Sequence, residues 1–176
     1  KRVFIGVGAV VLIVAAVFLY LNNRKAKNEE AELKLSAVIS LYDQEKYQEA
    51  INGDPGTGIT GLRQIVDDYG STTSGETAKL YLGNCYFNLK DYDNALKSFE
   101  DYSGDKAIIK ASCISGIGAV WEAKNDLKKA GEYFEKAAKV SKEVVTNEEN
   151  LFYAIRSYTN AGDKENAKRI YEQLKE

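Results

Sequence analysis

The chain has 176 residues, with 24 basic and 26 acidic side chains, a formal net charge of −2 and no histidine. The missing histidine excludes a histidine-based catalytic triad or metal site, and the absence of a basic stripe argues against a nucleic-acid partner. Cys85 and Cys113 stand far apart, each inside an apolar helical pattern. We interpret them as buried thiols. A disulfide, which would need an oxidising compartment, is the alternative.

The first predicted element is a membrane anchor. Nineteen residues from Val3 to Leu21 are uncharged and mostly apolar. A helix of this length spans roughly 28 Å at ~1.5 Å per residue, close to the ~30 Å hydrocarbon core of a bilayer. The run is longer than the apolar part of a secretory signal peptide and ends without a small-residue cleavage site. We therefore predict a transmembrane anchor over residues 1–23, with a signal peptide or a buried core helix as the alternatives.

The charges beside this run leave its orientation open. Two basic residues precede it, and Arg24, Lys25 and Lys27 follow it, a count that weakly favours a cytoplasmic position for the rest of the chain. The chain begins at Lys1 without a methionine, so we expect further residues before it and regard the count as incomplete.

The next predicted element is a continuation of the same helix. No glycine or proline occurs between Ala9 and Asn52. An apolar face with helical spacing follows at Leu35, Val38, Ile39 and Tyr42. We predict one long helix from about Val3 to Asp43, which would act as a stiff stalk. A frayed, charged linker over residues 24–32 is the alternative.

A loop insertion is predicted over residues 51–59, which contain three glycines and the only proline. Glycine-rich loops can bind phosphate, but no lysine follows this one and no buried strand precedes it, so we do not expect a nucleotide site. A helix from Thr60 to Tyr69 comes next, with Gly70 as its left-handed C-terminal residue. Residues Thr73 to Glu76 then fit a capping box for a further helix.

From residue 76 onward the chain repeats itself. Ala95, Ala130 and Ala167 recur at intervals of 35 and 37 residues, and each is followed four residues later by an aromatic side chain. The full set of repeat positions is Gly83, Tyr86, Ala95, Phe99, Gly118, Trp121, Ala130, Phe134, Tyr158, Ala167 and Tyr171. Small residues let paired helices pack closely, and the aromatic residues fill the space between pairs. The pattern resembles the tetratricopeptide repeat, whose period is about 34 residues.

This resemblance implies an all-α protein: an N-terminal transmembrane helix followed by a tetratricopeptide-like α-solenoid of stacked antiparallel helix pairs. The repeat domain covers residues 24–176. It comprises the stalk and an altered first repeat over 24–70, then repeats at 76–109, 111–144 and 148–176. The proline that usually ends each repeat is absent from all of them.

In such a solenoid the first helix of each pair lines a concave face. The residues predicted to bind a partner on this face are Leu80, Asn84, Phe87, Asn88, Ser115, Ala119, Glu122, Ala123, Phe152, Arg156, Thr159 and Asn160. Chaperone-binding members of the family grip a terminal carboxylate with lysine and arginine side chains, but Leu80 and Phe152 replace the lysines here. We expect an apolar peptide segment as ligand. The alternative is that this face packs against a partner subunit or the final helix.

No residue pattern in this chain predicts catalysis. The neighbouring carboxylates Asp67–Asp68 and Glu148–Glu149 point about 100° apart on a helix, so they do not form an acid–base pair. Residues 71–74 supply hydroxyl groups without a base to activate them. We expect no enzyme activity, cofactor or metal.

The whole arrangement resembles the YfgM-like ancillary subunits of the bacterial Sec translocon, most closely from Ala50 to Leu80. The resemblance implies a single-pass inner-membrane protein with its repeats in the periplasm, against the weak flank count. It implies protein partners among translocon subunits and periplasmic folding factors, with lipid around residues 3–21. The expected function is that of a membrane-tethered interaction subunit assisting export or periplasmic folding. The alternative is a structural accessory subunit bound permanently in a larger membrane complex.

Overall fold

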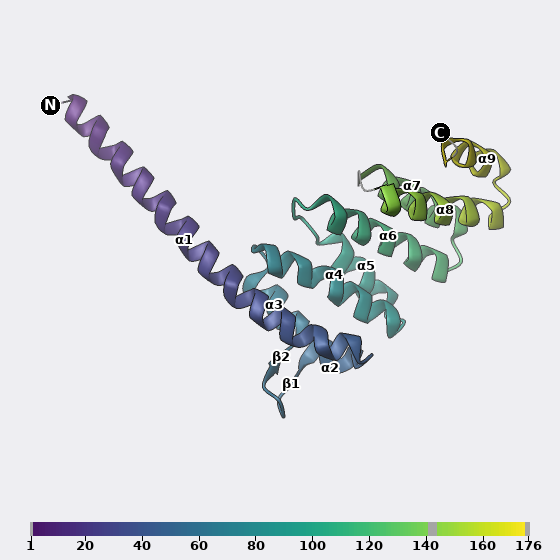
Figure 1. The fold of residues 1–176 in the computed structure, drawn as a ribbon, viewed down its shortest axis with the longest axis horizontal. Helices are drawn as coiled ribbons and strands as arrows, with labels where there is room; N and C mark the ends of the chain where they lie inside the picture. The colour runs from purple at the N-terminus through teal and green to yellow at the C-terminus, as the bar shows by residue number, and fades with distance from the viewer. Residues whose placement is uncertain (1, 141–143, 175–176) are drawn as a thin grey trace.

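The computed structural model describes the backbone of residues 2–140 and 144–174, and the side chains of residues 12–140 and 147–174. Helices stack side by side, and the first one extends far beyond the stack (Figure 1). They are α1 (Arg2–Asp43), α2 (Tyr47–Asn52), α3 (Leu62–Tyr69), α4 (Thr73–Asn88), α5 (Tyr92–Glu100), α6 (Ala107–Ala123), α7 (Leu127–Val140), α8 (Val144–Asn160) and α9 (Lys164–Leu174). The predicted all-α solenoid is confirmed at this level. Residues 141–143 and 175–176 lie outside the described residues. The predicted repeat boundary at 144 borders on the first of these segments, and the boundary at 176 falls within the second.

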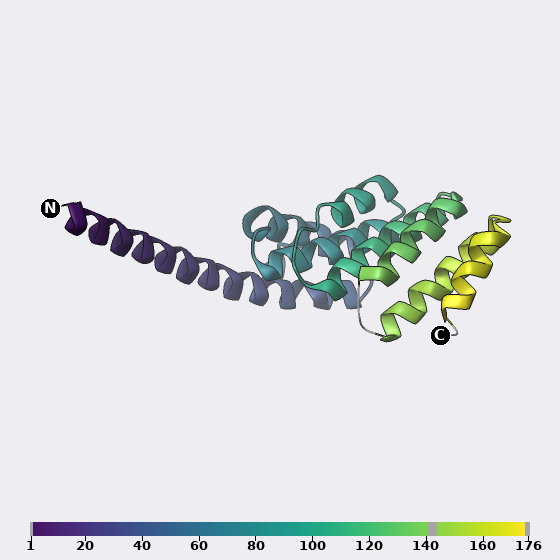
Figure 2. The same ribbon diagram turned by 90° about the horizontal axis from the view of Figure 1, so that it is seen from above.

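The long N-terminal helix is confirmed, because α1 runs without a break from Arg2 to Asp43. The frayed linker considered for residues 24–32 is therefore wrong. The second half of α1 packs on the repeats and buries Ala31 and Val38 completely. Its first half projects away from them, as Figure 2 shows from a second direction, and leaves Phe18 68% exposed.

No helix in the described part of the chain combines the length and the apolar character needed to cross a bilayer. The side chains of residues 1–11, within the anchor predicted over residues 1–23, lie outside the described residues.

Polar contacts fix α1 against the start of α4. Arg24 donates a hydrogen bond to the carbonyl oxygen of Ser71 at 3.3 Å, and the backbone N–H of Ser74 donates to Asn28 Oδ1 at 2.9 Å. The hydroxyl of Tyr69 donates to Glu30 at 2.7 Å, which raises the pKa of Tyr69 to about 12. These contacts, spread over two turns of α1, set the direction of the helix relative to the repeats.

The loop predicted over residues 51–59 is in part a small β-hairpin. Strand β1 (Gly53–Asp54) pairs antiparallel with β2 (Ile59–Thr60), with Gly53 opposite Thr60. In the turn, the carboxylate of Asp54 accepts hydrogen bonds from the Thr57 hydroxyl and the Gly56 backbone N–H, which lower the pKa of Asp54. The hairpin separates α2 from α3, so α3 packs on α1 and α4 as the continuation of the altered first repeat.

The connection between α3 and α4 differs from the prediction. Gly70 has a φ of −56°, so it is not a left-handed C-terminal residue. The chain instead continues through a tight right-handed turn, in which a Cβ atom at Gly70 would lie 2.5 Å from the carbonyl oxygen of Val66. The N-cap of α4 is Thr72 rather than Thr73, because the Thr72 hydroxyl oxygen accepts from the backbone N–H of Gly75 at 3.0 Å.

The predicted capping-box acid, Glu76, has another role. Its buried carboxylate accepts hydrogen bonds from the backbone N–H groups of Ser103 (2.8 Å) and Gly104 (3.1 Å) and from the ammonium group of Lys79 (2.8 Å). Burial alone would raise the pKa of Glu76, but the hydrogen bonds from Lys79 and Ser103 lower it overall. Glu76 therefore ties the start of α4 to the connection between α5 and α6.

The turns inside the helix pairs are regular. Lys90 and Asn125 adopt positive φ angles of 61° and 63°, and Gly162 follows with 75°. An aspartate comes directly after each and caps the next helix; Asp91, for example, accepts from the backbone N–H of Asn94 at 3.3 Å. The capping carboxylate satisfies an N–H group that the helix itself leaves without a partner. The repeating Asp therefore has a structural role at the start of each second helix.

Close packing of glycine against aromatic rings sets the spacing of the helices. The ring of Phe99 on α5 lies between Gly83 on α4 and Gly116 on α6. A Cβ atom added at Gly116 would lie 2.6 Å from this ring. Phe134 lies against Gly118 in the same way, at 2.9 Å. We call the contact of Gly83, Phe99 and Gly116 the Phe99 junction.

Most of the predicted repeat positions are buried, but not all. Ala95 and Ala130 are fully buried, as the repeat pattern predicts, whereas Ala167 is only half-buried. Tyr171 was expected to fill the space between pairs, but its side chain is 48% exposed. In the described part of the chain α9 is the last helix, so no following pair covers that face.

Ion pairing holds the last helix pair. Arg169 on α9 donates two hydrogen bonds, of 3.0 and 2.7 Å, to the carboxylate of Glu135 on α7. The same carboxylate accepts hydrogen bonds from the ammonium group of Lys139 at 2.6 Å and from the hydroxyl of Tyr158 at 3.3 Å. The hydrogen bonds from Arg169 hold the pKa of Glu135 at about 2. We call this group of four side chains the Glu135 junction.

The two cysteines are buried and free, which confirms their interpretation as thiols. Burial raises the pKa of Cys85 to about 12 and that of Cys113 to about 12. Since the thiolate is the reactive form, both side chains serve packing in this structure.

Candidate protein-binding groove

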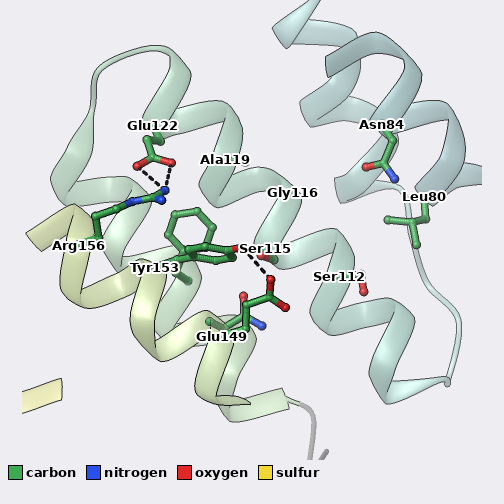
Figure 3. A pocket seen from close by; sticks show the side chains of 12 residues that line it. Leu80, Asn84, Ser112, Ser115, Gly116, Ala119, Glu122, Glu149, Tyr153 and Arg156 are labelled. Carbon is green, nitrogen blue, oxygen red and sulfur yellow. Dashed lines mark hydrogen bonds and ion pairs between the residues drawn. The ribbon is translucent and has the colours of Figure 1, made fainter. Parts of the chain in front are cut away.

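A groove of about 510 Å³ lies along α6, between α4 on one side and α8 on the other (Figure 3). Small side chains form its floor at helical spacing: Ser112, Ser115, Gly116 and Ala119. Residues three and four apart share one face of a helix, so these four leave a continuous shallow surface. A bound segment could therefore approach the backbone of α6 closely.

The two walls of the groove differ in character. The α4 wall presents the apolar Leu80 and the amide of Asn84. The α8 wall presents Glu149, Tyr153 and Arg156, each about one helical turn after the one before, as Figure 3 shows. A ligand in the groove would thus contact an apolar side chain on one side and charged and aromatic groups on the other.

Tyr153 organises the α8 wall. Its ring lies 5.3 Å from the ring of Phe134, between centroids, and closes the groove at that point. Its hydroxyl donates a hydrogen bond of 2.7 Å to Glu149, and this bond raises the pKa of Tyr153. The Glu149 carboxylate is therefore held in a defined position at the groove.

An ion pair, in which one guanidinium nitrogen contacts both carboxylate oxygens, crosses one end of the groove. Arg156 on α8 donates hydrogen bonds of 2.9 and 2.8 Å to the two carboxylate oxygens of Glu122 on α6. The guanidinium group also lies 5.1 Å from the centroid of the Tyr153 ring. In this arrangement both hydrogen bonds go to Glu122, so Arg156 is engaged within the groove.

The structure brings some of the predicted face residues together in this groove. They are Leu80, Asn84, Ser115, Ala119, Glu122 and Arg156. The sequence reasoning missed six further lining residues: Ser112, Gly116, Phe134, Glu149, Asn150 and Tyr153. Two of these could have been found, because Ser112 and Gly116 share a helical face with Ser115.

Other predicted face residues do not line this groove: Phe87, Asn88, Ala123, Phe152, Thr159 and Asn160. Phe87 packs instead against the core around Ala95, with its ring centroid 5.9 Å from that of Tyr92. Phe152 is 57% exposed beside the groove. The contacts of Tyr153 with Phe134 and of Arg156 with Glu122 turn a different face of α8 toward α6 from the one predicted.

Comparison with known protein families supports this architecture. The family model described as Tetratricopeptide repeat matches residues 77–103 and residues 149–176. The first match covers most of the pair α4–α5, and the second covers most of α8–α9. Comparison with curated proteins found no match. The two matches and the stacked helices support a tetratricopeptide-repeat protein, and these repeats indicate a protein-interaction module.

Proposed function

We propose that the chain is a membrane-tethered interaction subunit whose groove holds an extended or helical segment of a partner protein. The observation that carries this proposal is the groove itself, with a floor of small side chains on α6 and taller walls on α4 and α8. Ligand-binding grooves commonly combine a mostly apolar lining with a few polar groups that fix orientation. Asn84, Glu149 and Arg156 supply those groups here.

The tether is proposed from the sequence of α1 and from its course. Apolar side chains from Leu12 to Leu21 project into open space, with exposed fractions between 50% and 72% for the large ones. Burying such a surface in lipid is favourable by roughly 25 cal/mol per Å². Because α1 continues unbroken into the repeats, an anchor at residues 3–21 would hold the groove at a fixed distance and angle from the membrane.

We further propose a role in protein export or periplasmic folding beside the Sec translocon, with the repeats in the periplasm of a bacterial inner membrane. The support for this is the resemblance between Ala50 and Leu80 to the YfgM-like subunits. The interaction module and the apolar N-terminal run are both compatible with that role.

A second candidate is a structural subunit bound permanently within a larger membrane complex. It is favoured by exposed aromatic side chains on the last helix pair, where Phe152 is 57% and Tyr171 48% exposed. A stably associated partner would cover such side chains.

Purification of the full chain from membranes in a mild detergent separates the two candidates. The first predicts substoichiometric translocon subunits and client proteins. A single assembly with fixed stoichiometry supports the second and contradicts the first. Protease protection in spheroplasts tests the location, since cleavage of the repeats from the periplasmic side is expected and full protection would contradict it.

Alkaline carbonate extraction tests the tether. The full chain should stay in the membrane pellet, and the double variant Val14→Arg with Val17→Arg should be released, since charge within the hydrocarbon core is costly. The matched control places the same two substitutions at Lys25 and Lys27, where charge is already present. Release of the unaltered chain would contradict the tether while leaving the groove unaffected.

A further inference from the structure

We propose that the groove selects partner segments that present a lysine or arginine side chain, and that the carboxylate of Glu149 binds this cation. The inference rests on the proposed function, because it names the chemistry of the ligand for the same groove. It commits to one occupant, a segment of another protein with a basic residue flanked by apolar ones.

The charges around the groove favour a cation. Among the described residues that line it, two are acidic, Glu122 and Glu149, and one is basic, Arg156. Both terminal oxygens of Glu122 already accept hydrogen bonds from Arg156. Glu149 forms no ion pair with any described residue, so the described lining carries a net negative charge.

The geometry around Glu149 suits a bound ammonium or guanidinium group. Its oxygen Oε1 accepts from the Tyr153 hydroxyl at 2.7 Å, which fixes the side chain without neutralising it. A carboxylate held in place in this way loses less conformational entropy when a ligand binds. The side chain of Glu149 is exposed, so the cation can reach it from the open side of the groove.

Neighbouring groups complement the rest of such a side chain. The ring of Tyr153 and the side chain of Leu80 provide apolar surface on opposite walls, suited to the methylene stem of lysine or arginine and to flanking apolar residues. On the floor, the hydroxyl of Ser112 already donates to the carbonyl oxygen of Ile108 at 3.0 Å, so its oxygen faces a ligand as an acceptor. This acceptor and the carboxylate of Glu149 match the N–H donors of a basic side chain.

The test uses the full chain in a non-ionic detergent and an array of 12-residue peptides with blocked ends. Each apolar host sequence occurs in three versions that carry lysine, glutamine or glutamate at one central position. Binding constants are then measured in solution for the best trio, at low and at high salt. The lysine version should bind about tenfold more tightly than the glutamine version, and salt should reduce this difference.

Three variants locate the effect within the groove. Glu149→Gln should reduce the affinity for the lysine peptide about tenfold while its amide oxygen still accepts from Tyr153. Glu148→Gln is the matched control, since Glu148 is exposed and lies outside the groove, and it should leave the affinity unchanged. Arg156→Gln should strengthen lysine binding several-fold, because it leaves the carboxylate of Glu122 without its partner.

The outcomes separate this inference from the proposed function. Equal binding of the lysine and glutamate versions, or a preference for glutamate that Arg156→Gln abolishes, overturns the inference while peptide binding by the groove stands. A loss of affinity of the same size in Glu148→Gln as in Glu149→Gln overturns it as well. Binding by none of the peptides overturns both the inference and the proposed peptide-binding groove.

Discussion

The Phe99 junction and the Glu135 junction join neighbouring helices by different physical means. At the first, an aromatic ring fills the space that two glycines leave open, and the contact consists of apolar surface and shape. At the second, a carboxylate on α7 binds the guanidinium of Arg169 on α9, the hydroxyl of Tyr158 on α8 and the ammonium of Lys139 on its own helix. The Phe99 junction thus depends on volume and the Glu135 junction on charge, although each region also contains contacts of the other kind.

This difference makes a general point about the stack. An apolar junction is insensitive to pH and salt but intolerant of changes in volume, because protein interiors are packed without spare space. A charged junction on a partly exposed surface tolerates changes in volume but responds to protonation. A change in volume should therefore weaken the Phe99 junction more than the Glu135 junction, and a change in charge should do the reverse.

The largest effect is expected for Phe99→Ala. Removing a buried phenylalanine ring leaves a cavity and lowers the free energy of unfolding by about 3–5 kcal/mol. Denaturant unfolding of the full chain in detergent measures this change. Phe152→Ala is the matched control and should cost no more than about 0.5 kcal/mol, because that side chain is 57% exposed. Equal costs at the two positions would contradict the role assigned to Phe99.

A smaller loss is expected for Gly116→Ala. The added methyl group would lie 2.6 Å from the Phe99 ring, so the free energy of unfolding should fall by about 1–3 kcal/mol despite the better helix propensity of alanine. Combining it with Phe99→Leu tests the cause, since the smaller side chain makes room for the methyl group. The double variant should lose less than the sum of the two single losses, and simple additivity would contradict direct contact.

The charged junction is tested by Glu135→Gln. Losing the charge that Arg169 and Lys139 bind should lower the free energy of unfolding by about 1–2 kcal/mol, because both cations are partly exposed and screened. Glu132→Gln, on the exposed side of the same helix, should change it by a few tenths at most. Hydrogen exchange should place the loss of protection in α8 and α9, and a loss centred on α5 would contradict the assignment.

The weakest expected effect is the dependence of stability on acid pH. The pKa of Glu135 lies at about 2 in the folded chain against an ordinary value of 4.5, so the folded state favours the ionised form. The contribution of this ionised carboxylate to the free energy of unfolding is complete above about pH 5.5 and is lost as the pH falls toward 2. The free energy lost should not exceed the loss caused by Glu135→Gln. The variant should lack this part of the pH dependence. An identical slope in the variant and the natural chain would assign the effect to other carboxylates.

The sequence predicted the helices and the repeat period because both depend on local composition. Ala95, Ala130 and the aspartates in the turns recur at fixed intervals, and the absence of glycine and proline after Ala9 predicted the length of α1. The small hairpin over residues 53–60 was missed, since two-residue strands leave no periodicity. Gly116 was missed as well, because its role depends on Phe99 of the preceding helix pair, a contact between segments that are distant in sequence.

The groove was predicted only in part, for a related reason. The face of α6 follows largely from its spacing: Ser115, Ala119 and Glu122, predicted to share one face, line the groove, whereas Ala123 does not. The face of α8 does not follow from period alone, because pairing of Arg156 with Glu122 and stacking of Tyr153 on Phe134 determine how the helix turns about its axis. Glu149 was considered from the sequence only as one of two adjacent carboxylates that form no acid–base pair, and it lines the groove.

The most direct test of the central claim is photocrosslinking from the floor of the groove in intact cells. A photoreactive residue in place of Ser115 should cross-link the full chain to partner proteins, and an excess of the lysine peptide added to permeabilised cells should suppress these products. The same photoreactive residue in place of Glu132, on the exposed face of α7, should give few cross-linked products. Cross-links of equal yield from both positions, or from Glu132 alone, would contradict a function exerted through this groove.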